Sequence, residues 1–316
     1  MSDSRGADVL RSHAVWTQWE DIQVPETVKK LSPSSTPLES SDLSQITFYV
    51  PTYMGGRGAL EYVKSMPNLQ VLQLPNAGYD DAIEFLRPGI TLCNGAGIHD
   101  ASTAELAVGL TIASLRGFPD FIRAQQKGEW HHRRYRSIND RRIGILGFGA
   151  IGRHIARNLS GFDVEVLGFS RSGSSGSFTM DRFDELLPTL DVVILILPLT
   201  EESYHFFDSR RLSMLKDGAL IVNVARGAVI DTDALIKELN SGRIMAALDV
   251  TDPEPLPAAH PLWSAQGVFI SPHVGGNSSA FEPRARKLIE TQLSHLARGE
   301  SLTNVVVQGD SVGKLN

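Results

Sequence analysis

Short apolar runs alternate with helix-like stretches along the first part of the chain. The runs are short and partly β-branched, are bounded by Pro, Gly or Asn, and lie at 46–50, 69–74 and 90–93. Runs of this kind predict buried strands. Helical patterns separate them, for example at 59–65 and 81–85. Strands that alternate with helices predict a parallel sheet.

The alternation becomes regular after residue 142. Helices are predicted at 151–159 and 232–240, and an amphipathic helix at 284–298 follows Pro283. The run at 192–197 is apolar throughout, as expected for a strand with helices on both faces. Strands are predicted at 143–146, 164–169, 192–197, 220–224, 245–250 and 268–270. The whole pattern predicts an α/β fold with two βαβ domains, one of them built on a doubly wound parallel sheet.

Two segments between these halves do not follow the alternation. Residues 103–116 form a helix pattern that is apolar on nearly all sides, which predicts burial between domains or subunits. Residues 131–142 (HHRRYRSINDRR) are basic and are expected to form a solvated loop. His131 and His132 are adjacent rather than four residues apart, so we expect no metal site there.

Composition and charge exclude several classes of protein. At about 150 residues per domain, 316 residues suggest two domains. The formal net charge of −6 disfavours nucleic-acid binding and adhesion to an anionic membrane. The one cysteine, Cys93, cannot form a disulfide within the chain, which suits a reducing cytosol. The polar start lacks a secretory core, and no apolar run reaches the ~18–20 residues of a membrane span. We therefore expect a cytoplasmic protein.

A glycine-rich segment joins the predicted strand 143–146 to the helix 151–159. It reads Gly147-Phe148-Gly149-Ala150-Ile151-Gly152. Between a strand and a helix, this spacing is typical of a dinucleotide site: the first glycine allows a tight turn, the second admits the pyrophosphate, and the third allows close packing. The helix N-terminus then offers free N–H groups to the phosphates.

The end of the next strand indicates which dinucleotide is preferred. A carboxylate there would bind the ribose of NAD(H), but no Asp or Glu occurs between Glu165 and Asp181. Ser170, Arg171 and Ser172 stand in its place. Because a guanidinium pairs well with a 2′-phosphate, these residues favour NADP(H), with NAD(H) as the alternative.

Three later segments bring charged side chains to the ends of predicted strands. They supply Arg226, His273 and carboxylates near residue 250. A guanidinium can hold a carboxylate and polarise a carbonyl, and an imidazole can exchange a proton near neutral pH. A carboxylate beside the imidazole orients it and stabilises its protonated form. Such a set suits hydride transfer with a 2-hydroxy acid. Composition alone does not decide whether Asp252 or Glu254 is the carboxylate beside the imidazole.

The motifs together resemble those of the D-isomer-specific 2-hydroxyacid dehydrogenase family. This family includes glyoxylate/hydroxypyruvate reductases, phosphoglycerate dehydrogenases and D-lactate dehydrogenases. The similarity runs from about Leu69 to Ala297, and the motifs follow the family's order: GILGFGAIGRHIA, ILPLTEES, LIVNVARGAVID, AALDVTDPEPLP and ISPHVGG.

The resemblance implies a role for each matching residue. Arg226 would bind the substrate carboxylate and activate the keto oxygen, and His273 would be the acid/base. The Glu-Pro step of the family selects Glu254 as the partner of His273. The loop Asn76-Ala77-Gly78 would hold the substrate carboxylate through its N–H groups, and Asp249 would face the nicotinamide carboxamide. Cofactor contacts are also implied for Ala150, Ile151, Ala225, and, near the adenosine half, Pro198 and Thr200.

The resemblance also implies a domain plan. Residues 1–97 and 283–316 would form a smaller, flavodoxin-like substrate domain, and residues 98–282 the Rossmann domain that binds NAD(P). The active site would lie in a cleft that closes on the substrate. Members of the family usually form homodimers through the nucleotide domain, and the apolar helix 103–116 suits that role.

This chain differs from some members of the family at particular positions, and these differences restrict the class of substrate that we expect. Formate dehydrogenases have Gln where Glu254 stands, and phosphoglycerate dehydrogenases carry an Arg-Ser pair after the second strand, where this chain has no arginine before Arg57. A small 2-keto acid such as glyoxylate or hydroxypyruvate is therefore favoured. The alternatives are a dinucleotide-sensing binding protein of the same fold, or a dehydrogenase of 3-phosphoglycerate or phosphite.

Overall fold

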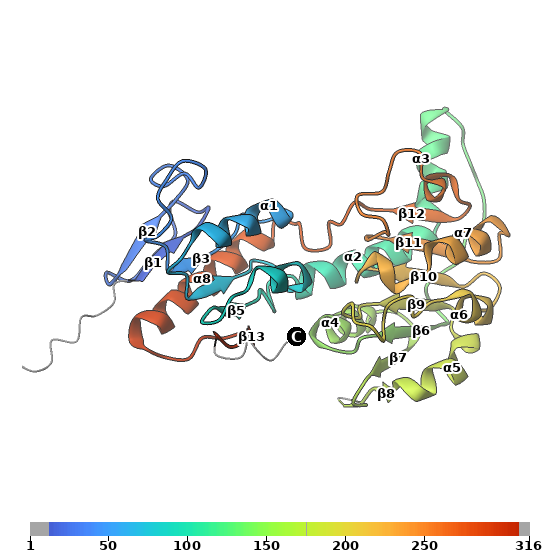
Figure 1. Cartoon of the computed structure of the whole chain (residues 1–316). Helices are drawn as coiled ribbons and strands as arrows, with labels where there is room; N and C mark the ends of the chain where they lie inside the picture. The colour runs from blue at the N-terminus through green and yellow to red at the C-terminus, as the bar shows by residue number, and fades with distance from the viewer. Residues whose placement is uncertain (1–12, 175, 310–316) are drawn as a thin grey trace, which may run out of the picture. The chain divides into compact units, whose positions relative to one another are not determined.

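The computed structural model describes residues 13–174 and 176–309, which divide into two compact units (Figure 1). The first unit contains the described residues up to Ile98 together with those from Phe281 onward, and the second unit is His99–Ala280. The chain thus passes between the units after Ile98 and after Ala280, whereas the sequence suggests passages after residues 97 and 282.

The first unit is built on a six-stranded sheet with the order β13-β5-β4-β3-β1-β2. Strands β1 to β5 are parallel in the order 2-1-3-4-5, which is flavodoxin-like, and β13 is antiparallel to β5. The strands are β1 (His13–Trp16), β2 (Val28–Leu31), β3 (Phe48–Tyr49), β4 (Val71–Gln73), β5 (Thr91–Cys93) and β13 (Val305–Val307). Its helices are α1 (Gly56–Glu61), the 3-10 helices η1 (Tyr62–Ser65) and η2 (Asp80–Phe85), and α8 (Phe281–Arg298).

Both faces of this sheet are buried. Neighbouring residues of a strand point to opposite faces, so Phe48 packs in the cluster that includes α8 while Tyr49 packs in the other. Cys93 lies in the α8 cluster with no exposed surface, and its burial raises the pKa of the thiol to about 12.

The second unit is built on a seven-stranded parallel sheet with the order β12-β11-β10-β9-β6-β7-β8. This is the doubly wound order, which reverses direction between β6 and β9, and it confirms the predicted Rossmann-type fold. The strands are β6 (Arg141–Leu146), β7 (Val164–Ser170), β8 (Phe178–Thr179), β9 (Val192–Leu195), β10 (Leu220–Asn223), β11 (Met245–Leu248) and β12 (Val268–Ile270). The α-helices are α2 (Asp100–Leu115), α3 (Phe118–Gln126), α4 (Ala150–Leu159), α5 (Phe183–Leu186), α6 (Ser209–Met214) and α7 (Thr232–Asn240).

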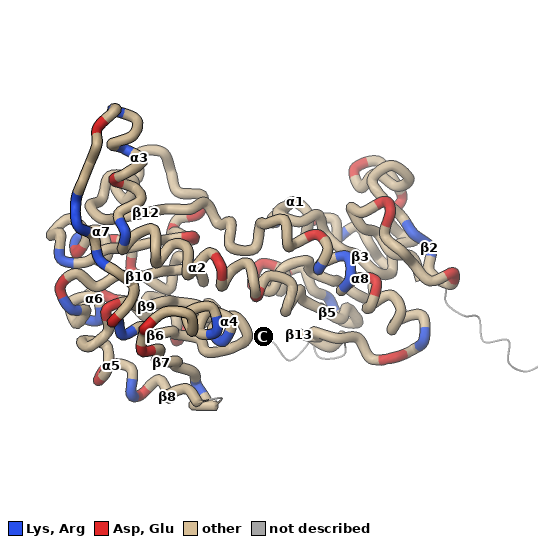
Figure 2. The backbone as a smooth tube through the Cα atoms, turned by 180° about the vertical axis from the view of Figure 1, so that it is seen from behind, with Lys and Arg blue, Asp and Glu red and all other residues tan. Residues whose placement is uncertain are grey.

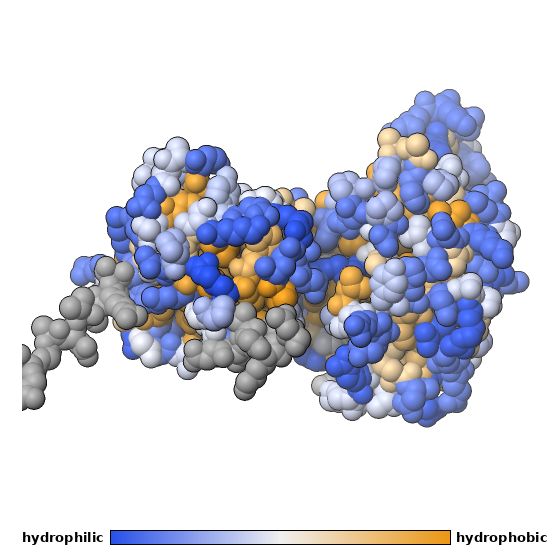
Figure 3. Space-filling view, viewed as in Figure 1, coloured by the Kyte–Doolittle hydropathy of each residue, from blue (hydrophilic) through white to orange (hydrophobic). Residues whose placement is uncertain are grey.

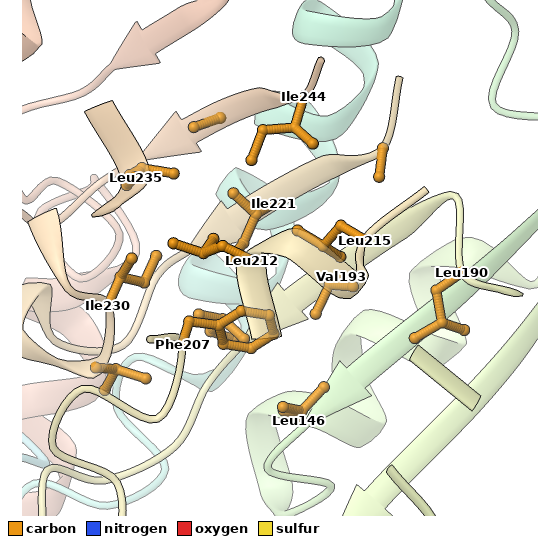
Figure 4. Close-up of a cluster of buried hydrophobic side chains, with 14 of the residues drawn as sticks. Leu146, Leu190, Val193, Phe207, Leu212, Leu215, Ile221, Ile230, Leu235 and Ile244 are labelled. Carbon is orange, nitrogen blue, oxygen red and sulfur yellow. The ribbon is translucent and has the colours of Figure 1, made fainter. Parts of the chain in front are cut away.

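Helices cover both faces of the seven-stranded sheet, as the apolar run at 192–197 predicts. On one face Val193 and Ile221 pack with Phe207 and Leu212 (Figure 4). On the other face Ile194 packs in a separate cluster with residues of α2 and α4. Helix α2 is therefore buried within the second unit, against β10 and α4, rather than only between domains or subunits. This inward packing explains why its sequence is apolar around most of its circumference.

Helix α3 and the segment after it form the most exposed apolar part of the second unit. Phe118, Phe121 and Ile122 of α3 are 46%, 38% and 52% exposed, and Trp130 is 95% exposed. The basic segment predicted as a loop follows (Figure 2), although its last two residues, Arg141 and Arg142, begin β6. The surface of the unit is otherwise mostly hydrophilic in the view of Figure 3. No helix among the described residues has the length and apolar character of a membrane span.

Candidate active site

The three glycines of the turn between β6 and α4 have different surroundings. Gly147 has a φ of +98°, and a Cβ there would lie 2.3 Å from the carbonyl oxygen of Ile196. A Cβ on Gly152 would lie 2.4 Å from the carbonyl oxygen of Gly147, whereas a Cβ on Gly149 would meet nothing within 4 Å. The first and third glycines are thus required by packing, and the second leaves open space beside the backbone.

Helix α4 begins at this open space. Its N-cap is Gly149, and among the described residues no side chain caps it. The N–H groups of the first turn are therefore available to an anion, and the helix dipole favours negative charge there. The residues present suit the pyrophosphate of a dinucleotide.

Ser170 and Arg171 lie at the carboxyl end of β7, the neighbour of β6. Ser170 Oγ accepts a hydrogen bond from the N–H of Gly173 (3.1 Å), so this serine shapes the turn. The Arg171 side chain is 86% exposed, and its Nη2 lies 4.0 Å from Oε2 of Glu202. A hydrogen bond from Thr200 and the nearby Arg171 charge hold the pKa of Glu202 below its ordinary value. Arg171 thus has a weak partner that an incoming anion can replace.

The turn from Pro198 to Ser203 is held by the Ser203 hydroxyl. Ser203 Oγ donates to the carbonyl oxygen of Pro198 (2.6 Å) and accepts from the N–H of Thr200 (2.7 Å). The turn follows β9, on the other side of β6 from β7, so it flanks the glycine turn at the same edge of the sheet.

Arg226 is placed by Asn223, the last residue of β10. The buried Asn223 side chain accepts from the N–H of Ala225 (3.0 Å) and donates to the carbonyl oxygen of Arg226 (2.9 Å). A Cβ on Gly227 would lie 2.0 Å from the carbonyl oxygen of Thr251, so the Arg226 loop is pressed against the loop that follows β11. This contact brings Arg226 close to the loop that carries Glu254.

Asp249 organises the loop after β12. Its Oδ1 accepts from Ser271 Oγ (2.6 Å) and from the N–H of Val274 (2.9 Å), and its Oδ2 accepts from the N–H of Gly275 (2.8 Å). Asp249 is buried, and its carbonyl oxygen accepts from the N–H of His273 (2.7 Å). Since a carboxylate has about four acceptor sites, these three side-chain bonds leave capacity for one more donor.

His273 and Glu254 form a hydrogen-bonded pair with 2.5 Å between Nδ1 and Oε1. The two side chains are 42% and 39% exposed. The hydrogen bond with Glu254 and its charge hold the pKa of His273 above its ordinary value, although burial and the nearby Arg226 charge oppose this. Burial alone would raise the pKa of Glu254, but the hydrogen bond with His273 and its charge hold it below the ordinary value. The residue types alone leave Asp252 and Glu254 as equal candidates for the carboxylate partner of His273. In the structure, Glu254 is the one that contacts the imidazole.

The predicted site residues are divided between the two units. Arg226, Asp249, Glu254 and His273 follow β10, β11 and β12 of the second unit, at the same edge as the glycine turn. The loop 76–78 follows β4 of the first unit. Asn94, which is not among the predicted site residues, contacts this loop by donating from Nδ2 to the carbonyl oxygen of Ala77 (2.7 Å). The residues 13–174 and 176–309 contain no group of three His, Cys, Asp or Glu side chains arranged to hold a metal ion.

Comparisons with known proteins agree with this geometry. The family profile "D-isomer specific 2-hydroxyacid dehydrogenase, NAD binding domain" matches residues 108–275. The glyoxylate reductase of Thermococcus gammatolerans is 30% identical over 315 residues, which cover 93% of this chain and 90% of that enzyme. The D-3-phosphoglycerate dehydrogenase of Methanocaldococcus jannaschii is 29% identical over 276 residues, which are 83% of this chain but 52% of that protein.

A solved structure of a member of this family has a similar fold. It is a D-isomer specific 2-hydroxyacid dehydrogenase from Xanthobacter autotrophicus in complex with NADPH and MES, with a TM-score of 0.74 and 26% identity. The match covers 94% of this chain and 98% of that chain. These enzymes transfer a hydride between a nicotinamide cofactor and a 2-hydroxy or 2-keto acid. The chain belongs to the D-isomer specific 2-hydroxyacid dehydrogenase family.

Proposed function

We propose that the protein is a cytoplasmic reductase that uses NADPH in preference to NADH and acts on a small 2-keto acid of the glyoxylate or hydroxypyruvate class. The observation that carries this proposal is the His273–Glu254 pair beside Arg226, which supplies a proton donor and a cationic carbonyl-binding group at one edge of the sheet. We assign the nucleotide to the second unit, whose glycine turn leaves open space at Gly149. When bound, the nicotinamide supplies the hydride.

His273 acts as the proton donor during reduction. Glu254 occupies Nδ1, which leaves Nε2 as the ring nitrogen that exchanges a proton with the substrate oxygen. The raised pKa keeps the imidazole protonated further into the neutral range, which is the form that reduction requires. In the oxidation direction the neutral ring accepts the proton from the hydroxyl group.

Arg226 binds the substrate through its planar guanidinium. A guanidinium holds a carboxylate with two parallel hydrogen bonds and polarises the adjacent carbonyl, on which negative charge develops during hydride attack. Asn223 and Gly227 fix the backbone on either side of Arg226, so little reorganisation is needed. Asp249 has acceptor capacity left for the nicotinamide carboxamide, and it also holds the loop that carries His273.

Turnover with a panel of 2-keto acids tests the proposed function. NADPH and NADH oxidation should be followed with glyoxylate, hydroxypyruvate, pyruvate, longer 2-keto acids and 3-phosphohydroxypyruvate. We expect the highest kcat/KM with NADPH and glyoxylate or hydroxypyruvate. Tight NADPH binding without turnover of any keto acid would contradict the proposal and favour a dinucleotide-sensing protein, and a preference for the phosphorylated substrate would contradict the substrate class.

Cofactor choice rests on Arg171, with Ser170 and Ser172 beside it. Replacing Arg171 with Ala should weaken NADPH binding by about 1.5–3 kcal/mol, the range for hydrogen bonds to charged groups, because the guanidinium pairs with the 2′-phosphate. NADH lacks that phosphate, so its binding should hardly change. Titration of protein fluorescence with each cofactor measures both affinities.

A matched control is Arg182→Ala, which removes an exposed arginine of the same unit that pairs with Glu185. This variant should bind both cofactors like the wild type. A wild-type protein that prefers NADH, or an Arg171→Ala variant that loses affinity for both cofactors equally, would refute the assignment of Arg171.

We further propose that the protein is a homodimer formed through α3 and the segment after it. The exposed Phe118, Phe121, Ile122 and Trp130 support this assignment, since exposed aromatic side chains are typical anchors of interfaces. The apolar helix at 103–116, which the resemblance to the family suggests for this role, is α2 and packs within the unit against β10 and α4.

Replacing Trp130 with Ala should weaken the dimer at least about tenfold, as expected for an interface anchor. The mass in solution, measured by light scattering over a dilution series, gives the dissociation constant. Tyr204→Ala removes another exposed aromatic side chain of the same unit and should leave the constant unchanged. A wild-type protein that is monomeric at every concentration would show the dimer proposal to be wrong.

A further inference from the structure

The loop 75–78 and the turn 94–96 lie against each other in the first unit. They follow β4 and β5, which are parallel neighbours with Gln73 opposite Cys93, so both segments leave the same edge of the sheet. The N–H of Gly95 donates to the carbonyl oxygen of Asn76 (2.8 Å). A Cβ on Gly95 would lie 2.8 Å from the carbonyl carbon and oxygen of Pro75, so the close approach requires glycine.

Three consecutive carbonyl groups of the loop are occupied. The carbonyl oxygen of Asn76 accepts from Gly95, that of Ala77 accepts from Asn94 Nδ2 (2.7 Å), and that of Gly78 accepts from Asn76 Nδ2 (2.8 Å). In a planar trans peptide the C=O group and the next N–H group point in opposite directions. The N–H groups of Ala77 and Gly78 are therefore turned away from the residues that hold the loop. Neither of them donates a hydrogen bond to any described residue.

The side chain and both backbone polar groups of Asn94 form hydrogen bonds. It is 7% exposed, its Oδ1 accepts from the N–H of Ala96 (3.2 Å), and its own N–H donates to the carbonyl oxygen of Asn304 (3.0 Å). Its carbonyl oxygen accepts from Nε2 of Gln73 (3.1 Å). Asn94 is thus fixed by Ala96 on its own turn and by Asn304 and Gln73 on two neighbouring segments.

Behind Asn94 a chain of buried amides extends to α8. Gln73 and Gln292 have no exposed surface, and Gln292 Nε2 donates to Gln73 Oε1 (2.8 Å) and to the carbonyl oxygen of Thr303 (2.8 Å). Gln292 Oε1 accepts from the N–H of Thr303 (2.9 Å). Every polar atom of the two glutamine side chains has a partner, and a buried network that is fully satisfied is rigid.

We propose that Asn94 is a positioning residue for the substrate carboxylate. By fixing the peptide between Ala77 and Gly78, it directs the Gly78 N–H outward. This N–H then lies beside that of Ala77, which the Gly95 bond to Asn76 orients, and the two form an anion-binding pair. The inference rests on the proposed function, because it takes the ligand to be the carboxylate of a 2-keto acid. Asn94 does not touch the substrate and acts only through the loop.

The direct test is Asn94→Ala, which removes the amide without adding a charge that would repel the substrate. We expect KM for the best keto acid, and the dissociation constant of oxalate in the presence of NADPH, to rise at least about tenfold, because the N–H donors to a charged group lose their orientation. The kcat should change much less, and NADPH binding should not change. Oxalate binding is a readout that does not depend on turnover.

The matched control is Asn304→Gly. Asn304 donates from Nδ2 to the carbonyl oxygen of Ala96 (2.9 Å), on the same turn, but does not contact loop 76–78. Glycine keeps its φ of +55° without strain. This variant should retain the wild-type KM and oxalate affinity. Where Asn94→Ala does not fold, Asn94→Ser replaces it, since the shorter hydroxyl side chain still offers an acceptor to the turn but does not reach Ala77.

The outcomes separate the two proposals. A selective rise in KM and in the oxalate dissociation constant for Asn94→Ala, with Asn304→Gly unchanged, supports the role of Asn94. Equal effects of both variants, or a loss of kcat with KM unchanged, would overturn it while an active wild-type enzyme leaves the proposed function intact. A wild-type protein that neither reduces any 2-keto acid nor binds oxalate would overturn both.

Discussion

Replacing Arg226 with Lys is expected to lower kcat/KM for a 2-keto acid about a hundredfold or more, the range seen when one donor to a developing oxyanion is removed. Lysine keeps the positive charge but loses the planar fork that holds a carboxylate with two hydrogen bonds. The charge alone therefore does not replace the arginine. Cofactor affinity should stay near that of the wild type, since the glycine turn and Arg171 are unchanged.

Steady-state kinetics with NADPH in excess give kcat and KM, and fluorescence titration gives the cofactor affinity. Arg210→Lys is the matched control, because Arg210 lies in the same unit and pairs at the surface with Asp184. That variant should behave like the wild type. Wild-type activity in Arg226→Lys would mean that other groups hold the substrate carboxylate.

Replacing Glu254 with Gln should move the pH profile of both reaction directions to lower pH. Reduction requires protonated His273, and Glu254 raises the pKa of that ring. Glutamine keeps the size of the side chain but removes the charge, so the pKa of His273 falls. The alkaline limb of the reduction profile then moves to lower pH. Along this limb the reduction rate falls about tenfold per pH unit, because only the protonated fraction of His273 can donate a proton to the substrate.

The oxidation direction requires the neutral ring, so its acidic limb should move to lower pH as well. Both profiles should be measured under conditions in which chemistry limits the rate, and the values describe the coupled pair rather than one residue. Asp252→Asn is the matched control: Asp252 lies two residues from Glu254, and the hydrogen bond and ion pair of the His273 ring are with Glu254 rather than with Asp252. If the Glu254→Gln limbs stay in place while those of Asp252→Asn move, Asp252 is the electrostatic partner of His273.

Most of the sheet in the second unit is predictable from the sequence because its strands are buried on both faces. The strand seen as β9 is apolar at every position, so periodicity and length both indicate it. Strands β1 and β2 of the first unit lack that signal. Strand β2 reads VKKL with Lys29 and Lys30 exposed, and its pairing with β1 at the sheet edge is decided by tertiary contacts.

A site residue is predictable from the sequence when its residue type is the one that the chemistry needs. It is less predictable when several residues of a suitable type are present and their positions in the fold determine which one acts. Arg226 and His273 stand out because they follow predicted strands. The choice between Asp252 and Glu254 requires either the family motif or the geometry, since both follow the same strand. Asn94 shows no charge and no motif beyond an Asn-Gly pair after a strand. Its role depends on contacts such as that between Gln73 and Gln292, which lie 219 positions apart in the sequence.

The burial of Cys93 means that a cysteine introduced elsewhere in the chain can be labelled site-specifically without first replacing the native cysteine. Maleimides react with the thiolate form of cysteine. The Cys93 thiol has a pKa of about 12 and no exposed surface, so almost no reactive thiolate is present at neutral pH. A cysteine introduced at the exposed position Tyr79, next to the loop 76–78, would therefore be the one site that reacts. A fluorophore attached there would report changes around this loop in an otherwise unlabelled enzyme.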